Sequence, residues 1–405
     1  MTNKALEGVT VLDFTQLLAG PYATEMLGDL GAKIIKIERI KTGDLFRGMD
    51  HLGKKLGKNL SPQYMAWNRN KRSISLDVRT EAGREIIYKM AETADVVVEN
   101  FRPGVMDRMG LGYEQLKKIN PKIIFASNSG YGTSGPYVTR PGQDQLIQGL
   151  TGMMTFIGSK KDGPIPIGPV LCDALSSLNL VYGILAALLY VQRTGKGQHI
   201  ECDLMRSMLA MQGEAYFGML NLGIHAQRPD SGIAHPMYGA PFGVYKCADG
   251  YLTIAMNPFD KVVKVLGAPE LLRYMENDEL FSKRDEIFYK MQDIMEKKPV
   301  DYWLEEMLKE DLWVAKVQNM EEAENDPQIK HIGIIKSYEH PHCGHICYIG
   351  SALSMSETPP EFYYAPPMIG ENSEEIMKEF GYSETEIEDY FNRGILYDET
   401  KEGGI

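Results

Sequence analysis

The chain has 405 residues, of which 43% are hydrophobic and 24% are charged, and its formal net charge at pH 7 is −12. These are globular values for a chain too long for one simple core, so we expect two domains, or one domain with a large excursion. The negative charge argues against nucleic acids and anionic membranes as general partners, and no apolar run has the uninterrupted length of a membrane span. The N-terminus has no signal-peptide core and the five cysteines are scattered. We therefore expect a cytoplasmic protein with reduced thiols.

Short β-like runs alternate with helical stretches over the first 200 residues. The expected strands are 9–14, 33–38, 95–100 and 123–127, and the expected helices are 21–30, 80–93, 113–119 and a buried helix over 178–191. This alternation predicts an α/β fold with a doubly wound parallel sheet. Ligands of such sheets bind at the carboxyl ends of the strands, which here are 15–16, 39, 100–101 and 127–128.

The pattern changes after residue 200 and predicts a smaller α+β domain. We expect one long Met-rich helix over 202–222, a hairpin over 242–256, helices over 258–311, β-like segments over 331–352, and an acidic amphipathic helix over 371–393 that packs on the first domain. The predicted large domain is 1–200 plus 365–405, the linkers are 201–225 and 331–364, and the small domain is 226–330.

Asp173 stands directly ahead of the apolar helix. The plain interpretation is an N-cap that accepts a backbone N–H. An ionised, oriented carboxylate at a helix start can also attack an acyl group, and the two roles are compatible.

A basic segment interrupts the acidic chain. Between residues 31 and 72 there are eleven Lys or Arg and three acids, which predicts a polyanionic ligand unless the segment is only a solvated basic loop. No Walker motif is present and no Gly-x-Gly-x-x-Gly follows the first strand, so a nucleotide site here would be of another design.

Several sequence blocks, dense over residues 6 to 205, carry a resemblance to a known family. They are Ala19-Gly20-Pro21, Leu27 to Glu38, Asn70 to Asp77, Val98 to Gly104, Asn120-Pro121-Lys122, Ser129 to Gly132 with Gly135-Pro136, and Thr194 to Gln198. In this order they resemble the class III CoA-transferases, which include formyl-CoA and carnitine CoA-transferases.

The resemblance implies a CoA-transferase that moves CoA from an acyl-CoA donor to a carboxylic acid through an aspartyl anhydride and an aspartyl-CoA thioester on Asp173. It implies no metal, no cofactor beyond coenzyme A itself, and a homodimer of two interlocked ring-like chains. The implied CoA-binding residues are Gln16, Leu17, Arg39, Leu76, Arg79, Asn100, Phe101, Arg108 and Arg140.

Two alternatives share these blocks: an α-methylacyl-CoA racemase and a non-catalytic CoA-binding paralogue. The racemases carry Gly-His-Asp where this chain has Gly142-Gln143-Asp144, and Gln143 cannot titrate, which favours the transferase. Asp173 argues against simple CoA binding.

The acceptor acid is expected to be larger than oxalate. Met49 stands where oxalate-handling members place an aromatic residue, and the segment around His235 and Tyr238 is not glycine-rich. Met49, Gln143, His235 and Tyr238 are therefore the candidate substrate contacts, for a short dicarboxylate or a substituted aliphatic acid with succinyl-CoA or acetyl-CoA as donor. The His/Cys cluster over 340–347 lacks a standard zinc spacing and is predicted to be a hairpin.

Overall fold

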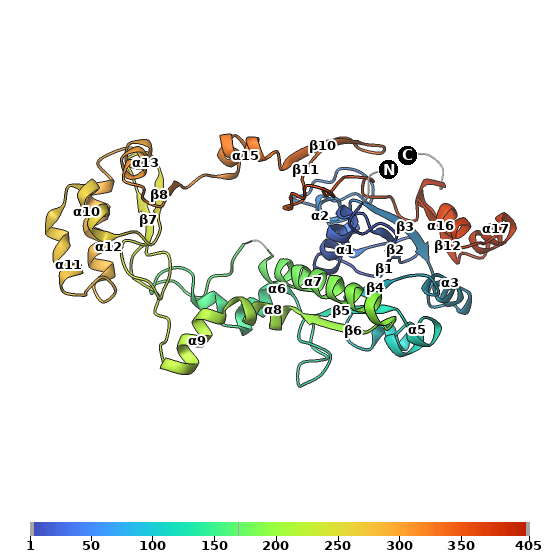
Figure 1. The fold of residues 1–405 in the computed structure, drawn as a ribbon. Coiled ribbons are helices and arrows are strands. Elements are labelled where there is room, and N and C mark those ends of the chain that lie inside the picture. Colours follow the sequence, from blue (N-terminus) through green and yellow to red (C-terminus); the bar gives the residue numbers. More distant parts are fainter. Residues whose placement is uncertain (1–3, 169, 402–405) are drawn as a thin grey trace. The chain divides into compact units, whose positions relative to one another are not determined.

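A computed structural model describes residues 4–168 and 170–401 of the chain, which form two compact units (Figure 1). The large unit comprises Met1–Ile147, Val170–Met208 and Lys330–Ile405, and the small unit comprises Gln148–Pro169 and Leu209–Ile329. This division assigns 331–364, expected as a linker, to the large unit, and 148–169, expected in the large domain, to the small one.

The large unit is built on a seven-stranded sheet with the order β12-β3-β2-β1-β4-β5-β6. Its strands are β1 (Thr10–Asp13), β2 (Lys33–Glu38), β3 (Lys71–Leu76), β4 (Val96–Glu99), β5 (Ile124–Ser129), β6 (His199–Asp203) and β12 (Leu396–Tyr397). All neighbours pair in parallel except β12, which is antiparallel to β3. The predicted α/β fold with a parallel sheet is confirmed.

Helices cover both faces of this sheet. Helices α1 (Ala19–Asp29) and α7 (Leu171–Thr194) share one core with β1, β2, β4 and β5, whereas α3 (Glu81–Ala91) and α5 (Tyr113–Ile119) share another with the opposite strand faces. Helices α16 (Ser373–Glu379) and α17 (Glu384–Asn392) join the second core. The unit also contains α2 (Pro62–Ala66), α4 (Val105–Arg108), the 3-10 helices η1 (Leu45–Gly48) and η4 (Glu399–Lys401), and the hairpin β10 (Ile335–His340) with β11 (Gly344–Ile349). Helices α6 (Asp144–Leu150) and α8 (Leu204–Met211) begin in this unit and end in residues assigned to the small unit.

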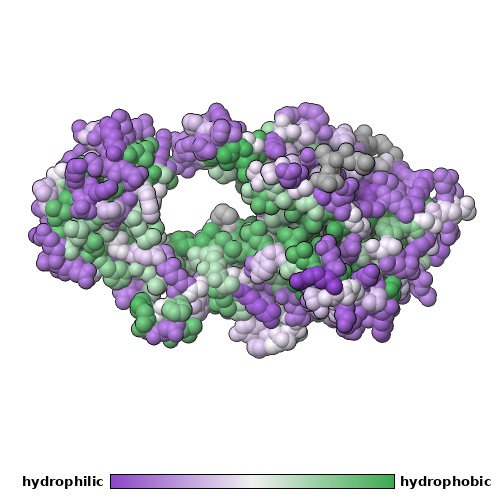
Figure 2. All heavy atoms as spheres, viewed as in Figure 1, coloured by the Kyte–Doolittle hydropathy of each residue, from purple (hydrophilic) through white to green (hydrophobic). Residues whose placement is uncertain are grey.

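Helix α7 buries one face and exposes the other. Leu180, Ile184 and Ala187 pack in the core, and α7 contacts α1, β5 and β6. The opposite stripe carries exposed Leu178, Tyr182, Leu189 and Tyr190, and Figure 2 shows hydrophobic residues gathered over this helix. In the described part of the chain α7 alone is long and apolar enough to cross a membrane, a test that core helices of α/β proteins also pass.

The small unit combines a three-stranded antiparallel sheet with helices. The strands are β7 (Gly243–Lys246), β8 (Tyr251–Ile254) and β9 (Val314–Lys316), and the first two form the predicted hairpin. The helices along this part of the chain are α9 (Gly213–Leu222), α10 (Phe259–Leu266), α11 (Leu272–Glu276), α12 (Arg284–Met295), α13 (Val300–Lys309), α14 (Met320–Glu324) and α15 (Pro327–Ile332).

Two predicted long helices are each divided. The segment 202–222 begins in β6, where Cys202 pairs with Asn128, and continues as α8 and α9 with a break at Gln212. The tail 371–393 is α16 and α17, because Gly381 adopts a left-handed φ of 76° and Ser383 starts the second helix with a capping box.

Candidate active site

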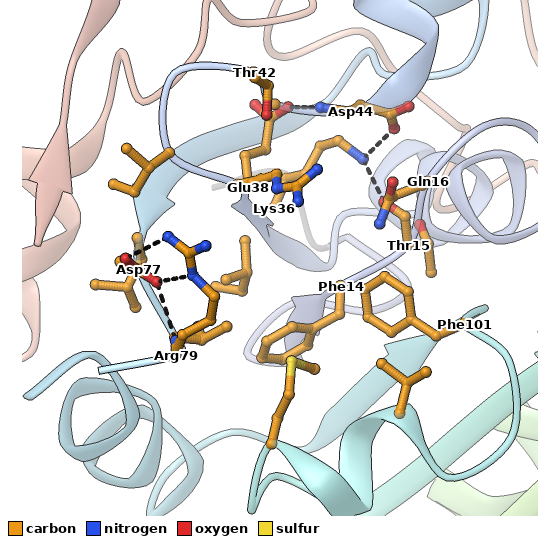
Figure 3. Close-up of a pocket in the computed structure, with 18 residues that line it drawn as sticks. Phe14, Thr15, Gln16, Lys36, Glu38, Thr42, Asp44, Asp77, Arg79 and Phe101 are labelled. Carbon is orange, nitrogen blue, oxygen red and sulfur yellow. Dashed lines mark hydrogen bonds and ion pairs between the residues drawn. The ribbon is translucent and has the colours of Figure 1, made fainter. Parts of the chain in front are cut away.

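A cavity of about 530 Å³ lies at the carboxyl ends of β1 to β4 (Figure 3). Its walls are formed by the last residues of the strands and by residues that follow them: Phe14 to Gln16, Lys36 to Ile40, Thr42 to Asp44, Leu76 to Arg79, and Phe101 with Val105 and Met109. The order of the strands reverses between β1 and β4, and this is where doubly wound sheets bind their ligands. The volume is within the usual range for sites of small molecules and cofactors.

Buried charges form the floor beneath this cavity. Lys36 pairs with Asp44 at 2.9 Å and donates to the carbonyl of Thr15 at 2.9 Å. Burial alone lowers the pKa of Lys36, but the charges of Asp44, Asp13 and Glu38 raise it above its ordinary value, so the ammonium group is kept. Glu38 is held by Arg47, with Nε–Oε1 at 2.8 Å and Nη2–Oε2 at 2.6 Å.

Asp13, at the end of β1, is the second centre of this charge network. Burial raises its pKa, but Lys71, Lys36 and the hydroxyls of Thr15 and Thr24 lower it to about 2. Burial lowers the pKa of Lys71 to about 8, although Asp13 lies 3.1 Å away. Charged side chains of β1, β2 and β3 are therefore buried in the large unit, where they form ion pairs with one another and with neighbouring residues.

Two arginines at the cavity differ in what they contact. Arg79 makes a bidentate pair with Asp77, with Nε–Oδ1 and Nη2–Oδ2 both at 2.8 Å, and its side chain remains 75% exposed. Arg39 is exposed at the end of β2 and makes no ion pair with residues 4–168 or 170–401. Both guanidinium groups can meet an anionic ligand.

The predicted CoA-binding residues divide between two cavities. Gln16, Arg39, Leu76, Arg79 and Phe101 line the large cavity. Asn100, Phe101 and Arg140 line a smaller cavity of about 120 Å³ with Ser129 to Gly132 and Gly142. Leu17 and Arg108 line neither of the two, although Leu17 follows Gln16 directly and Arg108 lies on α4 between the lining residues Val105 and Met109.

Asp173 is the third residue of α7 and is half-buried. It is not the helix cap that we predicted. The cap is Asp144 of α6, whose Oδ1 accepts the N–H of Cys172 at 2.7 Å and lies 3.4 Å from the nitrogen of Asp173. No residue of the described ranges donates a hydrogen bond to the carboxylate of Asp173. Burial, and then the charge of Asp144, raise its pKa to about 7, whereas we had expected backbone donors to hold it ionised.

The candidate substrate contacts lie in both units. In the large unit, Met49 follows η1 and is 47% exposed, and Gln143 is exposed just before α6. In the small unit, the rings of His235 and Tyr238 are 4.8 Å apart, and Tyr238 donates a hydrogen bond to Glu214.

Most lysines and arginines of the basic segment form ion pairs within the chain, and its interpretation as a polyanion-binding segment stays a prediction. Lys33, Lys36, Arg47, Lys58, Arg69, Lys71 and Arg72 all pair with carboxylates. Of its lysines and arginines, Lys36 and Arg39 line the large cavity. The sequence analysis missed Asp44, a wall residue that pairs with Lys36 and lies within the basic segment. The 340–347 cluster forms the β10–β11 hairpin as predicted, and the described residues contain no group of metal-ligating side chains.

Comparison with known proteins identifies the family. The model of CoA-transferase family III matches residues 6–373, so the chain belongs to this family of CoA-transferases. Human succinyl-CoA:glutarate CoA-transferase is 33% identical over 97% of this chain and 90% of its own length. Acetyl-CoA:oxalate CoA-transferase of Acetobacter aceti is 36% identical over 80% and 83%, and formyl-CoA:oxalate CoA-transferase of Escherichia coli is 30% identical over 94% and 97%.

Solved structures agree with this assignment. A CAIB/BAIF family protein from Brucella suis is 32% identical with a TM-score of 0.79, and covers 93% of this chain and 100% of its own. A protein from Mycobacterium tuberculosis is 26% identical with a TM-score of 0.80, and covers 92% of this chain and 99% of its own.

Proposed function

We propose that the protein transfers CoA from succinyl-CoA to a short dicarboxylic acid of about the size of glutarate, with Asp173 as the nucleophile. The environment of Asp173 supports its assignment as the nucleophile. Its carboxylate is half-buried in the first turn of a helix and receives no hydrogen bond from the described residues, and its pKa is raised to about 7. A carboxylate of this kind is a stronger nucleophile than an ordinary one and is still substantially ionised at neutral pH.

In the proposed reaction, each step converts one activated acyl group, a thioester or an anhydride, into another. The Asp173 carboxylate attacks the thioester carbonyl, the carbon–sulfur bond breaks, and a mixed anhydride and CoA thiolate result. The thiolate then attacks the aspartyl carbonyl, which releases the donor carboxylate and leaves an aspartyl-CoA thioester. The acceptor carboxylate attacks this thioester and expels CoA thiolate, which leaves a second anhydride between Asp173 and the acceptor. The thiolate then attacks the acceptor carbonyl of this anhydride, which gives the new acyl-CoA and releases the Asp173 carboxylate. The protein supplies orientation and exclusion of water.

The large cavity is proposed to hold the nucleotide of CoA, with Arg39 and Arg79 on its phosphates. The smaller cavity is proposed to receive the pantetheine arm, with Asn100, Phe101 and Arg140 in its walls. This cavity includes Gly142, which lies two residues before Asp144, and Asp144 contacts the first turn of α7. We propose that the two cavities, which share Phe101, and the start of α7 form one path for CoA in the large unit. Leu17 and Arg108 would act from its margin, and Met49, Gln143, His235 and Tyr238 would contact the acceptor.

The choice of substrate rests on the relatives. Three relatives with 31% to 34% identity over more than nine-tenths of this chain are described as transferases of CoA between succinate and glutarate. Met49 in place of a bulky aromatic residue agrees with an acceptor larger than oxalate. We further propose that the protein is cytoplasmic. We also propose a homodimer, which is supported by the exposed apolar stripe on α7 that a second copy would cover.

Trapping the intermediate tests the nucleophile. Incubation with succinyl-CoA followed by hydroxylamine should convert Asp173 to a hydroxamate, detected by mass spectrometry of the peptide that contains it. Asp173→Asn is the matched control and should give no label and no transfer, with CoA affinity within an order of magnitude of the wild type. Transfer activity that survives in this variant would refute the assignment. A panel of acyl-CoA donors and carboxylates tests the substrates, and strong preference for formyl-CoA with oxalate would refute our choice.

A further inference from the structure

The start of α7 is capped by a residue from another helix. Its own N-cap residue, Val170, has no side-chain acceptor, and helices require partners for their first N–H groups. Asp144, 3% exposed, provides one: its Oδ1 accepts the N–H of Cys172 at 2.7 Å and lies 3.4 Å from the nitrogen of Asp173. A carboxylate therefore holds the turn that bears the nucleophile.

A close backbone contact places Asp144 at this position. A Cβ atom on Gly130 would lie 2.6 Å from the Cα of Gly142, and a Cβ on Gly142 would lie 2.5 Å from the Cα of Gly130. Only glycine at both positions lets the segment before α6 approach the end of β5 so closely. The carbonyl of Gln143 then accepts the N–H groups of Leu146 and Ile147 and starts α6. The approach is therefore built into the backbone and does not depend on a flexible side chain.

We propose that Asp144 is a positioning residue for Asp173: it fixes the first turn of α7 from outside the helix and sets a second negative charge beside the reacting carboxylate. This inference rests on the proposed role of Asp173 as nucleophile. A neutral capping residue could hold the first turn of α7, but it could not place a negative charge beside Asp173.

Asp144 is the charged residue that most affects the Asp173 carboxylate. After burial, the charge of Asp144 is the cause that raises the pKa of Asp173 to about 7. Burial, Asp144 and Asp173 raise the pKa of the adjacent Cys172 thiol to about 12, so this thiol is neutral. Ser176 and Ser177, three and four residues further along α7, contact α1, β5 and β6 through uncharged groups: the carbonyl of Ala19, the amide of Asn128 and the thiol of Cys202, whose pKa is raised by burial.

Asp144→Asn separates the capping of α7 from the electrostatic effect on Asp173. The amide oxygen of the new side chain can still accept the N–H of Cys172, but the negative charge is lost. The pKa of Asp173 should then fall by roughly one unit. We expect the acid limb of kcat/KM to move to lower pH by this amount, so that the variant exceeds the wild type below pH 6. Above pH 8 it should be several-fold slower, since a less basic carboxylate is a weaker nucleophile.

The experiment compares pH profiles of kcat/KM from pH 5 to 9 for the wild type, Asp144→Asn and Asp144→Ala with one donor, so that ionisation of the substrate cancels. Asp144→Ala, which also removes the cap, should unfold at lower urea concentration than Asp144→Asn. The exposed neighbour provides the control variant Gln145→Ala, which should keep the wild-type profile.

An unchanged acid limb in Asp144→Asn would overturn the proposal, since a purely structural cap predicts that result. Hydroxylamine labelling of Asp173 distinguishes this failure from failure of the proposed function. Absence of label in the wild type removes the nucleophile and this proposal with it, whereas a labelled Asp173 with an unchanged acid limb overturns only the role of Asp144.

Discussion

Replacement of Asp173, the proposed nucleophile, should stabilise the protein, and the gain in stability should depend on pH. The pKa of Asp173 is raised from 3.8 to about 7, chiefly by burial. An acid with a raised pKa in the folded state binds its proton more tightly there than in the unfolded chain. Ionisation of Asp173 therefore destabilises the fold progressively from pH 3.8 upward, and the full cost is reached above pH 7. Asp173→Asn removes this cost.

The magnitude follows from the same pKa shift. Between pH 5 and pH 8 the ionisation cost would grow by about two pKa units, an upper limit of roughly 2.7 kcal/mol. Because the side chain is only half-buried and solvent screens its charge, we expect the advantage of Asp173→Asn to increase by about 1 kcal/mol over this range. Effects of the amide that do not depend on pH cancel in the comparison.

Urea unfolding followed by tryptophan fluorescence at pH 5, 6.5 and 8 measures this difference. Asp162→Asn is a useful control, because the N–H and hydroxyl of Ser159 lower the pKa of the exposed Asp162 carboxyl. Asp162 is ionised in both states throughout this range, so the effect of its replacement should not vary with pH. An advantage of Asp173→Asn that is constant or falls as pH rises would refute the raised pKa and the nucleophile environment inferred from it.

Two further predictions concern the large cavity. Arg39→Ala should raise KM for acyl-CoA about tenfold with a smaller change in kcat, as expected when a charge-assisted contact present in ground and transition states is lost. Arg108→Ala should raise it less, since Arg108 lies outside the cavity wall, and steady-state kinetics with unchanged KM in both variants would remove both from the site. Arg47→Ala should lower the free energy of unfolding by about 3–5 kcal/mol, because it leaves the buried carboxylate of Glu38 without its ion-pair partner. Urea unfolding measures this loss, and a loss below about 1 kcal/mol would show that Glu38 is not ionised in the fold.

The sequence predicted the strands that are apolar and missed those that are not. β2 was predicted with its observed bounds, because Lys33–Glu38 contains three isoleucines. β3 was missed since Lys71, Arg72, Ser73 and Ser75 look like a surface segment. Its charged residues are buried only because Asp13, on β1, and Glu375 and Glu379, on α16, pair with them, and contacts across such distances in sequence have no local signal.

The candidate site divides in a similar way. The carboxyl ends of the strands located the large cavity, which lies where the alternation of strands and helices placed it. The cap of α7 was assigned to Asp173 by proximity, but Asp144 provides it from 28 residues away. Rules for helix caps use adjacent residues, so they cannot find a cap that depends on two glycine backbones meeting elsewhere.

The loop after β1 determines how the proposed nucleotide site would work without a glycine-rich motif. In glycine-rich loops, successive backbone N–H groups point at the phosphates. Here three successive N–H groups are already used by side chains: that of Thr15 donates to Asp13 at 2.9 Å, that of Gln16 to Asn100 at 2.8 Å, and that of Leu17 to Asp44 at 3.0 Å.

These three hydrogen bonds also hold Leu17 at a φ of 65°, a conformation that is unfavourable for a residue with a side chain. The loop is thus fixed before any ligand arrives, but it has no N–H groups at these positions to offer an anion. Negative charge must be met by side chains instead, and Arg39 and Arg79 are the guanidinium groups that line the large cavity. The buried ion pairs of Asp13 and Asp44 with Lys71 and Lys36 therefore serve the site indirectly, since they keep in place the acceptors that define the loop.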